Sequence, residues 1–141
     1  MKLSIIIPFY NEQKTLAALL AKVHAVQLES PWEKEIILVD DGSCDGSSEI
    51  AQSEVRSHPD RTRLISLPKN QGKGFATREG LQSATGTICL IQDADLEYDP
   101  EDYKTILSAY RDPEVHVVYG SRILGSRNRF SWTYYWGGRC V

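Results

Sequence analysis

The chain has 141 residues, enough for one domain with one hydrophobic core, and its 41% apolar and 25% charged residues are ordinary for a soluble globular protein. The net charge of −3 gives no reason to expect nucleic-acid binding, and no apolar run approaches the roughly 20 residues that span a bilayer. The three cysteines lie far apart without metal-ligand spacing, so we expect a reducing, cytoplasmic compartment.

Strands and helices are predicted to alternate along the chain. The strands are expected at Leu3–Phe9, Glu35–Val39, Arg63–Leu67, Thr87–Ile91 and Val115–Tyr119. Helical spacing of apolar residues fills the gaps, from Leu16 to Val26, from Ile50 to Val55, from Phe75 to Ala84 and from Pro100 to Tyr110. We expect Ser43 or Asp45 to cap the second helix. Such alternation predicts an α/β fold with a mostly parallel sheet and helices on both faces.

The strands themselves are predicted to be buried. The first strand alternates poorly between apolar and polar residues, which is typical of a strand that is covered on both faces. Pro8 interrupts it too early for a signal peptide. The fourth strand is an apolar run, and its Cys89 is expected to be a small core residue.

Polar side chains gather where the predicted strands end. Since the carboxyl ends of parallel strands meet at one edge of a sheet, where ligands bind in open α/β folds, these side chains are expected to converge there. The residues expected at this edge are Tyr10, Asn11, Glu12, Asp40, Asp41, Lys73, Asp93, Asp95 and Arg122. This convergence is a stronger indication of a site than any one motif.

Asp93 and Asp95 follow the fourth strand, and Pro100 is favoured at the first position of the helix after them. Side chains at i and i+2 of an extended backbone share one side, so the two carboxylates are expected to converge while Ala94 turns away. Hard oxygen ligands of this kind suit Mg²⁺ or Mn²⁺. The alternative is an acidic turn that only caps the next helix.

Three further segments are each ambiguous alone. The carboxylates of Asp40 and Asp41 can accept hydrogen bonds from a ribose or a base, although helix capping is the simpler interpretation of Asp40. The Gly72-Lys73-Gly74 loop can bring N–H groups and an ammonium to a phosphate, but it matches no established phosphate motif. Pro8-Phe9-Tyr10-Asn11-Glu12 offers an aromatic face and a carboxylate for a base, or is simply a turn between strand and helix.

Taken in order, these segments resemble family 2 glycosyltransferases of the GT-A fold, a Rossmann-like nucleotide-diphospho-sugar transferase fold. The resemblance is greatest to polyprenyl-phosphate (dolichyl-phosphate) mannosyl- and glucosyltransferases, and it covers residues 3 to about 125. The segments that carry it are Pro8–Glu12, Val39–Ser47, Asn70–Gly74, Asp93–Pro100 and Tyr119–Arg122. It implies a donor-binding part at residues 1–125, with residues 126–141 beginning an incomplete acceptor side.

The resemblance also implies roles for single residues. The nucleotide-sugar would contact Pro8, Tyr10, Asn11, Glu12, Asp41, Lys73 and Asp93. Asp93 and Asp95 match the family's Asp-x-Asp pair, which holds Mg²⁺ or Mn²⁺ on the donor diphosphate. Glu97 stands where close relatives often have Gln as a further metal ligand, so its role is less certain. Arg122 matches an arginine near the acceptor phosphate, and Arg127 and Arg129 are possible helpers.

The acceptor can be argued from what the sequence lacks. A sugar hydroxyl would need a general base within hydrogen-bond reach. His24 and His58 fall within or after predicted helices and His116 within a predicted strand, so none is a convincing base. A lipid phosphate is already anionic and needs cations to align it, which Arg122 can supply. We therefore expect hexose transfer from GDP-mannose or UDP-glucose to a polyprenyl phosphate, by one in-line displacement with inversion.

Other interpretations remain open. The chain can be a binding module that holds donor and cation without turnover, because it resembles only the front part of such enzymes. A receiver-like signalling domain fits less well, since a receiver gathers its acids near the first and third strands. The aromatic and basic residues from Ile123 to Val141 suit either a core helix or a membrane interface. Donor, acceptor, membrane attachment and oligomeric state stay undecided.

Overall fold

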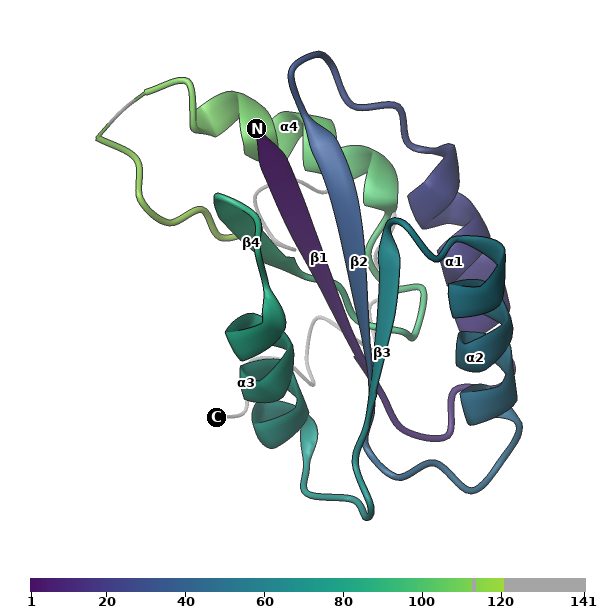
Figure 1. The fold of residues 1–141 in the computed structure, drawn as a ribbon. Coiled ribbons are helices and arrows are strands. Elements are labelled where there is room, and N and C mark those ends of the chain that lie inside the picture. Colours follow the sequence, from purple (N-terminus) through teal and green to yellow (C-terminus); the bar gives the residue numbers. More distant parts are fainter. Residues whose placement is uncertain (113, 121–141) are drawn as a thin grey trace, which may run out of the picture. The chain divides into compact units, whose positions relative to one another are not determined.

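The computed structural model describes residues 1–112 and 114–120. The chain divides into two compact units, and the first, Met1–Lys104, contains the whole sheet. The elements are β1 (Lys2–Phe9), α1 (Leu16–Ala25), β2 (Glu33–Asp40), α2 (Ser47–Ser57), β3 (Thr62–Ser66), α3 (Lys73–Ser83), β4 (Ile88–Ile91), the 3₁₀ turn η1 (Pro100–Asp102) and α4 (Tyr103–Ala109) (Figure 1). The predicted alternation of strands and helices is confirmed as far as α4.

The four strands form one parallel sheet in the order β3-β2-β1-β4. Ile6 of β1 is the register partner of Ile37 in β2 and of Ile91 in β4. All carboxyl ends therefore lie at one edge of the sheet, and the segments that follow β1, β2 and β4 start from neighbouring positions. The sheet thus positions residues that are more than 80 apart in the sequence.

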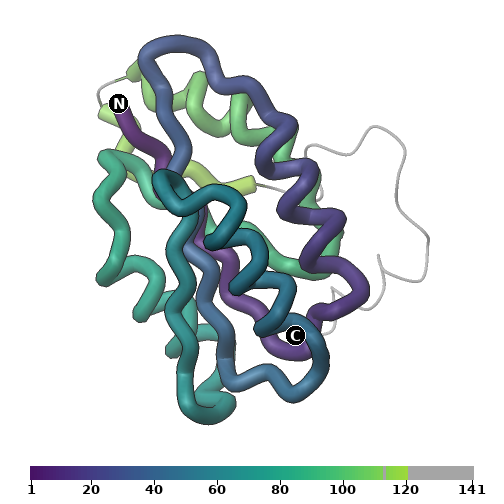
Figure 2. Tube along the Cα trace, turned by 45° about the vertical axis from the view of Figure 1, so that its right-hand side comes forward, coloured from purple at the N-terminus to yellow at the C-terminus, as the bar shows by residue number. Residues whose placement is uncertain are grey.

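The core lies on both faces of the two central strands, which are buried along nearly their whole length. On one face, Ile6, Ile37 and Val39 pack with Ala76 of α3. Ile5 and Ile7 point to the opposite face because side chains alternate along a strand. Helix α2 contacts β2 and β3 on the sheet, and α1 lies beside α2 (Figures 1 and 2). This layering matches the expected α/β architecture.

Close packing of α3 on the sheet depends on Gly80. A Cβ added there would lie 2.4 Å from Cγ2 of Ile6 and 3.2 Å from Cγ2 of Val39. We expect Gly80→Ala to lower the free energy of unfolding by about 1–3 kcal/mol, because the added methyl overpacks the core. Gly74 is the matched control in the same helix, with nothing within 4 Å of its added Cβ. Urea unfolding should leave Gly74→Ala unchanged or slightly more stable, and equal losses in both variants would contradict this packing argument.

A polar cluster is buried at the opposite, amino-terminal edge of the sheet. Its centre is the carboxylate of Glu35, which is only 7% exposed. The carboxylate accepts hydrogen bonds from the Ser4 hydroxyl, from the hydroxyl and amide of Thr85 and from the amide of Gly86, and it pairs with Arg63 at 2.9 Å. Burial alone would raise the pKa of Glu35, but the hydrogen bonds from Ser4 and Thr85 together with Arg63 outweigh it and lower the pKa to about 2.

Two expectations about the strands are wrong. Residues 114–120 contain no strand, although one was predicted at Val115–Tyr119. Val117 and Tyr119 are 63% and 88% exposed there. Strand β4 is an edge strand of the described sheet, and its residues alternate between half-buried and exposed. Cys89 of β4 is therefore exposed instead of lying in the core.

Capping of α2 also differs in detail from the prediction. The N-cap position is Gly46, and no side chain caps it there. The Asp45 carboxylate instead accepts hydrogen bonds from the amide and hydroxyl of Ser47, the first residue of α2. The hydroxyl of Ser47 is the main cause that holds the pKa of Asp45 below its usual value. None of the helices in the described part of the chain is long and apolar enough to cross a membrane.

Candidate donor-binding site

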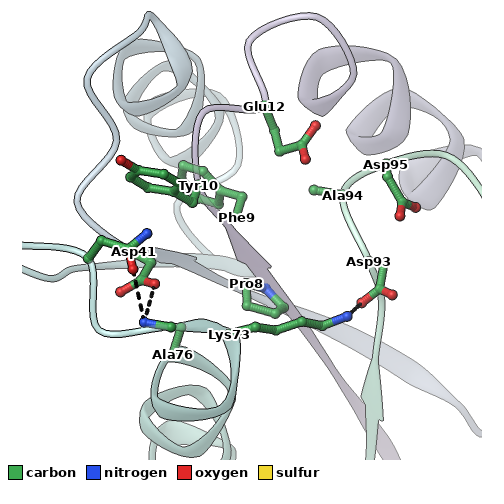
Figure 3. A pocket seen from close by; sticks show the side chains of 12 residues that line it. Pro8, Phe9, Tyr10, Glu12, Asp41, Lys73, Ala76, Asp93, Ala94 and Asp95 are labelled. Atoms are coloured by element: carbon green, nitrogen blue, oxygen red, sulfur yellow. Dashed lines mark hydrogen bonds and ion pairs between the residues drawn. The ribbon is translucent and has the colours of Figure 1, made fainter. Parts of the chain in front are cut away.

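A pocket of about 300 Å³ lies at the carboxyl edge of the sheet. Figure 3 shows Tyr10 and Asp41 on one side of it and Asp93 and Asp95 on the other, with Lys73 extended between them. The lining residues are Pro8, Phe9, Tyr10, Glu12, Asp41, Asn70, Gly72, Lys73, Ala76, Asp93, Ala94 and Asp95. The segments after β1, β2, β3 and β4 thus contribute to one cavity, as the predicted convergence of the strand ends required.

Asp41 fixes the loop that forms one wall of the pocket. Its carboxylate is buried and accepts hydrogen bonds from the amides of Gln71 and Gly72, both at 2.8 Å. The loop also passes so close to Gly42 that an added Cβ would lie 2.7 Å from the carbonyl carbon of Lys69. Gly42 has φ +74°, a conformation that glycine adopts without strain. Asp41 therefore holds the backbone ahead of Lys73 in place.

Asp40 has a structural role, although it does not cap α2 as the simpler interpretation of its sequence position predicted. It is 3% exposed and is absent from the pocket lining. Its carboxylate accepts hydrogen bonds from the Ser43 amide at 2.8 Å and from the Ser48 hydroxyl. It thereby connects the end of β2 to the start of α2, directly before Asp41, which lines the cavity.

The segment after β1 is held by hydrogen bonds to the segment after β2. Asn11 has φ +56°, and its side-chain oxygen accepts a hydrogen bond from the Cys44 amide. It joins two loops and does not line the pocket. Glu12 does line the pocket, and its amide donates to the Ser47 hydroxyl while its carboxylate accepts from Thr15. Tyr10 is 44% exposed and presents its ring to the cavity (Figure 3).

Asp93 and Asp95 place two carboxylates on the same side of the pocket (Figure 3). The prediction of an extended backbone between them is wrong, because Ala94 and Asp95 form a turn, and Ala94 lines the pocket instead of turning away. Leu96, directly after the pair, has φ +65°. Asp93 is mostly buried and its Oδ1 lies 2.5 Å from Nζ of Lys73. This carboxylate thus already holds a positive charge in the cavity. Two carboxylates beside an open cavity fit a hard divalent cation.

Gln92 and Tyr103 support the position of Asp93, although neither belongs to a predicted motif. The Gln92 side chain is 2% exposed and donates a hydrogen bond to the carbonyl of Asp93 at 3.0 Å. Its oxygen accepts from the Tyr103 hydroxyl at 2.7 Å. Burial raises the pKa of Tyr103 far above its usual value, so the hydroxyl stays a donor. The only sequence signal was a polar residue that directly follows an apolar strand.

The other predicted site residues lie elsewhere. Glu97 is exposed and absent from the pocket lining, and its amide donates a hydrogen bond to Asp95. Arg122, Arg127, Arg129 and the aromatic residues after them lie outside the described residues. The Gly72–Gly74 segment does reach the cavity, because Gly72 and Lys73 both line it.

Comparison with known proteins identifies the family. The family model described as "Glycosyl transferase family 2" matches residues 4–139, which is nearly the whole chain. A dodecaprenyl-phosphate galacturonate synthase of Rhizobium johnstonii is 31% identical over 122 residues, 86% of this chain and 36% of that protein. An undecaprenyl-phosphate 4-deoxy-4-formamido-L-arabinose transferase of Pseudomonas aeruginosa is 33% identical over 138 residues, 98% of this chain and 40% of that protein. The chain therefore spans little more than a third of these relatives.

Solved structures give the same fold. The mannosyltransferase PcManGT from Pyrobaculum calidifontis, in complex with GDP-Man and Mn²⁺, has a TM-score of 0.71 and 28% identity, over 80% of this chain and 33% of that one. TarS residues 1–349 from S. aureus, in complex with UDP-GlcNAc, has a TM-score of 0.66 and 28% identity, over 80% and 32%. The parallel sheet with its flanking helices thus has the GT-A fold.

Proposed function

Since the chain belongs to glycosyl transferase family 2, we propose that it forms the donor-binding part of an enzyme that transfers a hexose from a nucleotide-diphosphate sugar to a polyprenyl phosphate. The observation that carries this proposal is the single pocket that joins the segments after all four strands. An aromatic ring, an ammonium and two carboxylates line it, and these groups suit the base, the diphosphate and the cation of a nucleotide-sugar complex.

Each lining residue has a proposed part in donor binding. Pro8, Tyr10, Glu12 and Asp41 would surround the nucleoside, and Lys73 would lie against the diphosphate. Asn11 would act through the loop that it holds. The amides of Gln71 and Gly72 would act indirectly, because they bind the Asp41 carboxylate and so hold the loop before Lys73. The relatives with solved structures bind guanosine and uridine donors, so both bases are candidates here.

Asp93 and Asp95 would hold Mg²⁺ or Mn²⁺. A bound cation would neutralise the charge that develops on the departing nucleoside diphosphate. The chain's own part is to present both carboxylates at the cavity, and the hydrogen bond from Gln92 to the Asp93 carbonyl supports the position of Asp93. Glu97 is a candidate further ligand only if its side chain turns toward the cavity.

The proposed acceptor is a polyprenyl phosphate at the membrane surface, on the cytoplasmic side. Both curated relatives named above are polyprenyl-phosphate enzymes. No histidine of the described residues lines the pocket, which fits an acceptor that needs no general base. The phosphate oxygen would attack the anomeric carbon as the bond to the diphosphate breaks, giving inversion. Arg122 is the proposed residue that aligns the phosphate.

The alternative is a binding module that does not turn over. It rests on the pocket alone, whose lining supplies groups for a nucleotide and a cation. Such a module would bind nucleotide and cation through the same pocket and lack the acceptor side. Binding measured apart from transfer distinguishes the two possibilities.

Calorimetric titration with GDP and UDP, each with and without Mn²⁺, tests the donor site. We expect one of the two nucleotides to bind at least about 10-fold more tightly, and only with Mn²⁺, because the diphosphate and Asp93 otherwise repel each other. Transfer of labelled sugar to a polyprenyl phosphate then separates enzyme from binding module. A folded chain that binds neither nucleotide with Mn²⁺ would refute the proposed donor site.

A further inference from the structure

A second cluster of ligand-type side chains lies outside the pocket, between α1 and α2. It consists of His24 in the last turn of α1, Glu54 in the last turn of α2, and His58 directly after α2. We call these three residues the His–Glu cluster. All three are half-buried, and one ligand atom from each lies within 4.8 Å of the others. None of them contributes to the proposed donor site.

The nitrogen and oxygen atoms of the cluster face one another. Nε2 of His24 lies 2.5 Å and Nδ1 of His58 2.7 Å from the same oxygen, Oε1 of Glu54. The imidazole rings stack with centroids 4.1 Å apart and an interplanar angle of 23°. Nδ1 of His58 is buried and has no aligned hydrogen-bond partner among the described residues. One carboxylate thus faces two imidazole nitrogens, and the nitrogen of His58 contacts it without an aligned hydrogen bond.

The backbone fixes the three ligands before any ion binds. Glu54 and His58 are four residues apart, which places them on one side of the α2 axis. The Lys34 ammonium donates hydrogen bonds to the carbonyls of Val23, His24 and Val26, and so holds the end of α1 that carries His24. The site needs only side-chain rotation to accept an ion.

We propose that the His–Glu cluster binds one Zn²⁺. Two imidazole nitrogens and one carboxylate are a ligand set that zinc accepts in proteins, with water in the fourth position. The carboxylate offsets part of the charge of the ion, and the half-buried position limits competition from water. Mg²⁺ prefers oxygen ligands and would favour the Asp93 pocket, so the two sites differ in metal preference.

The zinc would connect the carboxyl-terminal ends of α1 and α2, which are the ends away from the pocket. At the pocket end, the segments before α1 and α2 are joined by hydrogen bonds from Glu12 to Ser47 and from Gln13 to Asp45. At the distal end, the contact between His24 and Glu54 and the stacking of His24 on His58 link the two helices. An ion there would stabilise the pair of helices without contacting the donor.

The test is Zn²⁺ binding by the chain in an Asp93→Asn/Asp95→Asn background, which removes the other candidate cation ligands. We expect one Zn²⁺ per chain by calorimetry, and Co²⁺ in its place should give the strong visible absorption of a low-coordinate ion. The Tm should rise by roughly 5–10 °C at free Zn²⁺ about 100 times Kd. His24→Gln and His58→Gln should abolish all three signals, since glutamine keeps a hydrogen-bonding amide but replaces the imidazole ligand.

His116→Ala is the matched control, because His116 is exposed and lies outside the cluster. It should bind zinc like the parent chain. If the glutamine variants fold by circular dichroism and still bind Zn²⁺ like the parent, the proposal is wrong. It is equally wrong if the parent chain binds no Zn²⁺, in which case the three residues are only a hydrogen-bonded link between the helices. Neither outcome bears on the donor pocket.

Discussion

Asp95→Asn is expected to weaken Mn²⁺-dependent nucleotide binding by roughly 100-fold or more. The substitution keeps the shape of the side chain and removes one of two anionic ligands beside the cavity. Changes that only touch a metal's supporting residues cost about 10–100-fold, so loss of a direct ligand should cost at least the upper value. Asp93→Asn should have a similar effect, and it also releases Lys73 from its ion pair. Calorimetric titration with the preferred nucleotide and Mn²⁺ measures both variants.

Asp99→Asn is the matched control for this experiment. Asp99 lies in the same loop and carries the same charge, but it does not line the pocket. It caps η1 by accepting a hydrogen bond from the Glu101 amide, and asparagine is an equally good cap. The Asp99→Asn variant should bind the nucleotide with Mn²⁺ as tightly as the unchanged chain does. Equal losses in the Asp95 and Asp99 variants would mean that general charge, and not a cation at Asp95, controls binding.

Glu35→Ala should lower the free energy of unfolding by about 3–5 kcal/mol at pH 7, because it leaves the groups around a buried carboxylate without their acceptor. The pKa of Glu35 falls from an ordinary 4.5 to about 2 on folding. Stability from this group is therefore fully present above pH 4.5 and is lost as the pH falls toward 2. That loss amounts to roughly 3 kcal/mol. Urea unfolding measures the free energy of unfolding of the unchanged chain and of the Glu35→Ala variant between pH 2 and 7. The difference between the two should shrink as the pH falls from 4.5 toward 2.

Glu33→Ala provides the comparison, because Glu33 lies on the same strand and is exposed. The free energy of unfolding of the Glu33→Ala variant should equal that of the unchanged chain at every pH. A difference between the Glu35 variant and the unchanged chain that stays constant from pH 7 to pH 2 would show that packing, and not the ionised carboxylate, accounts for the loss.

The sequence was sufficient for the parts of the fold that local patterns determine. Apolar runs such as Leu3–Phe9 and helical spacing such as Leu16–Val23 predicted elements within a few residues of their bounds. The convergence of Tyr10, Asp41 and Asp93 also followed from sequence, because parallel strands must bring their carboxyl ends to one edge. The pocket could therefore be located from two features of the sequence, the parallel direction of the strands and the polar residues that follow them.

The errors arose where the outcome depends on neighbours in space. The Val115–Tyr119 run has strand-like composition, but β structure needs a hydrogen-bonding partner, and none is present in the described part of the chain. Cys89 was assigned to the core because its run is apolar, whereas an edge position leaves it exposed. The roles of Gln92 and Tyr103 could not be predicted, since eleven residues of sequence separate two groups that form one hydrogen bond.

The ion pair between Lys73 and Asp93 makes cation binding an exchange reaction. A divalent ion that binds Asp93 must displace an ammonium 2.5 Å away, and the released lysine is then an unpaired positive charge beside the cavity. An incoming diphosphate supplies the new counter-ion. We therefore expect nucleotide and Mn²⁺ to raise each other's affinity by the same factor, as thermodynamic linkage requires. Additive, independent affinities in the two orders of titration would show that Lys73 does not mediate such coupling.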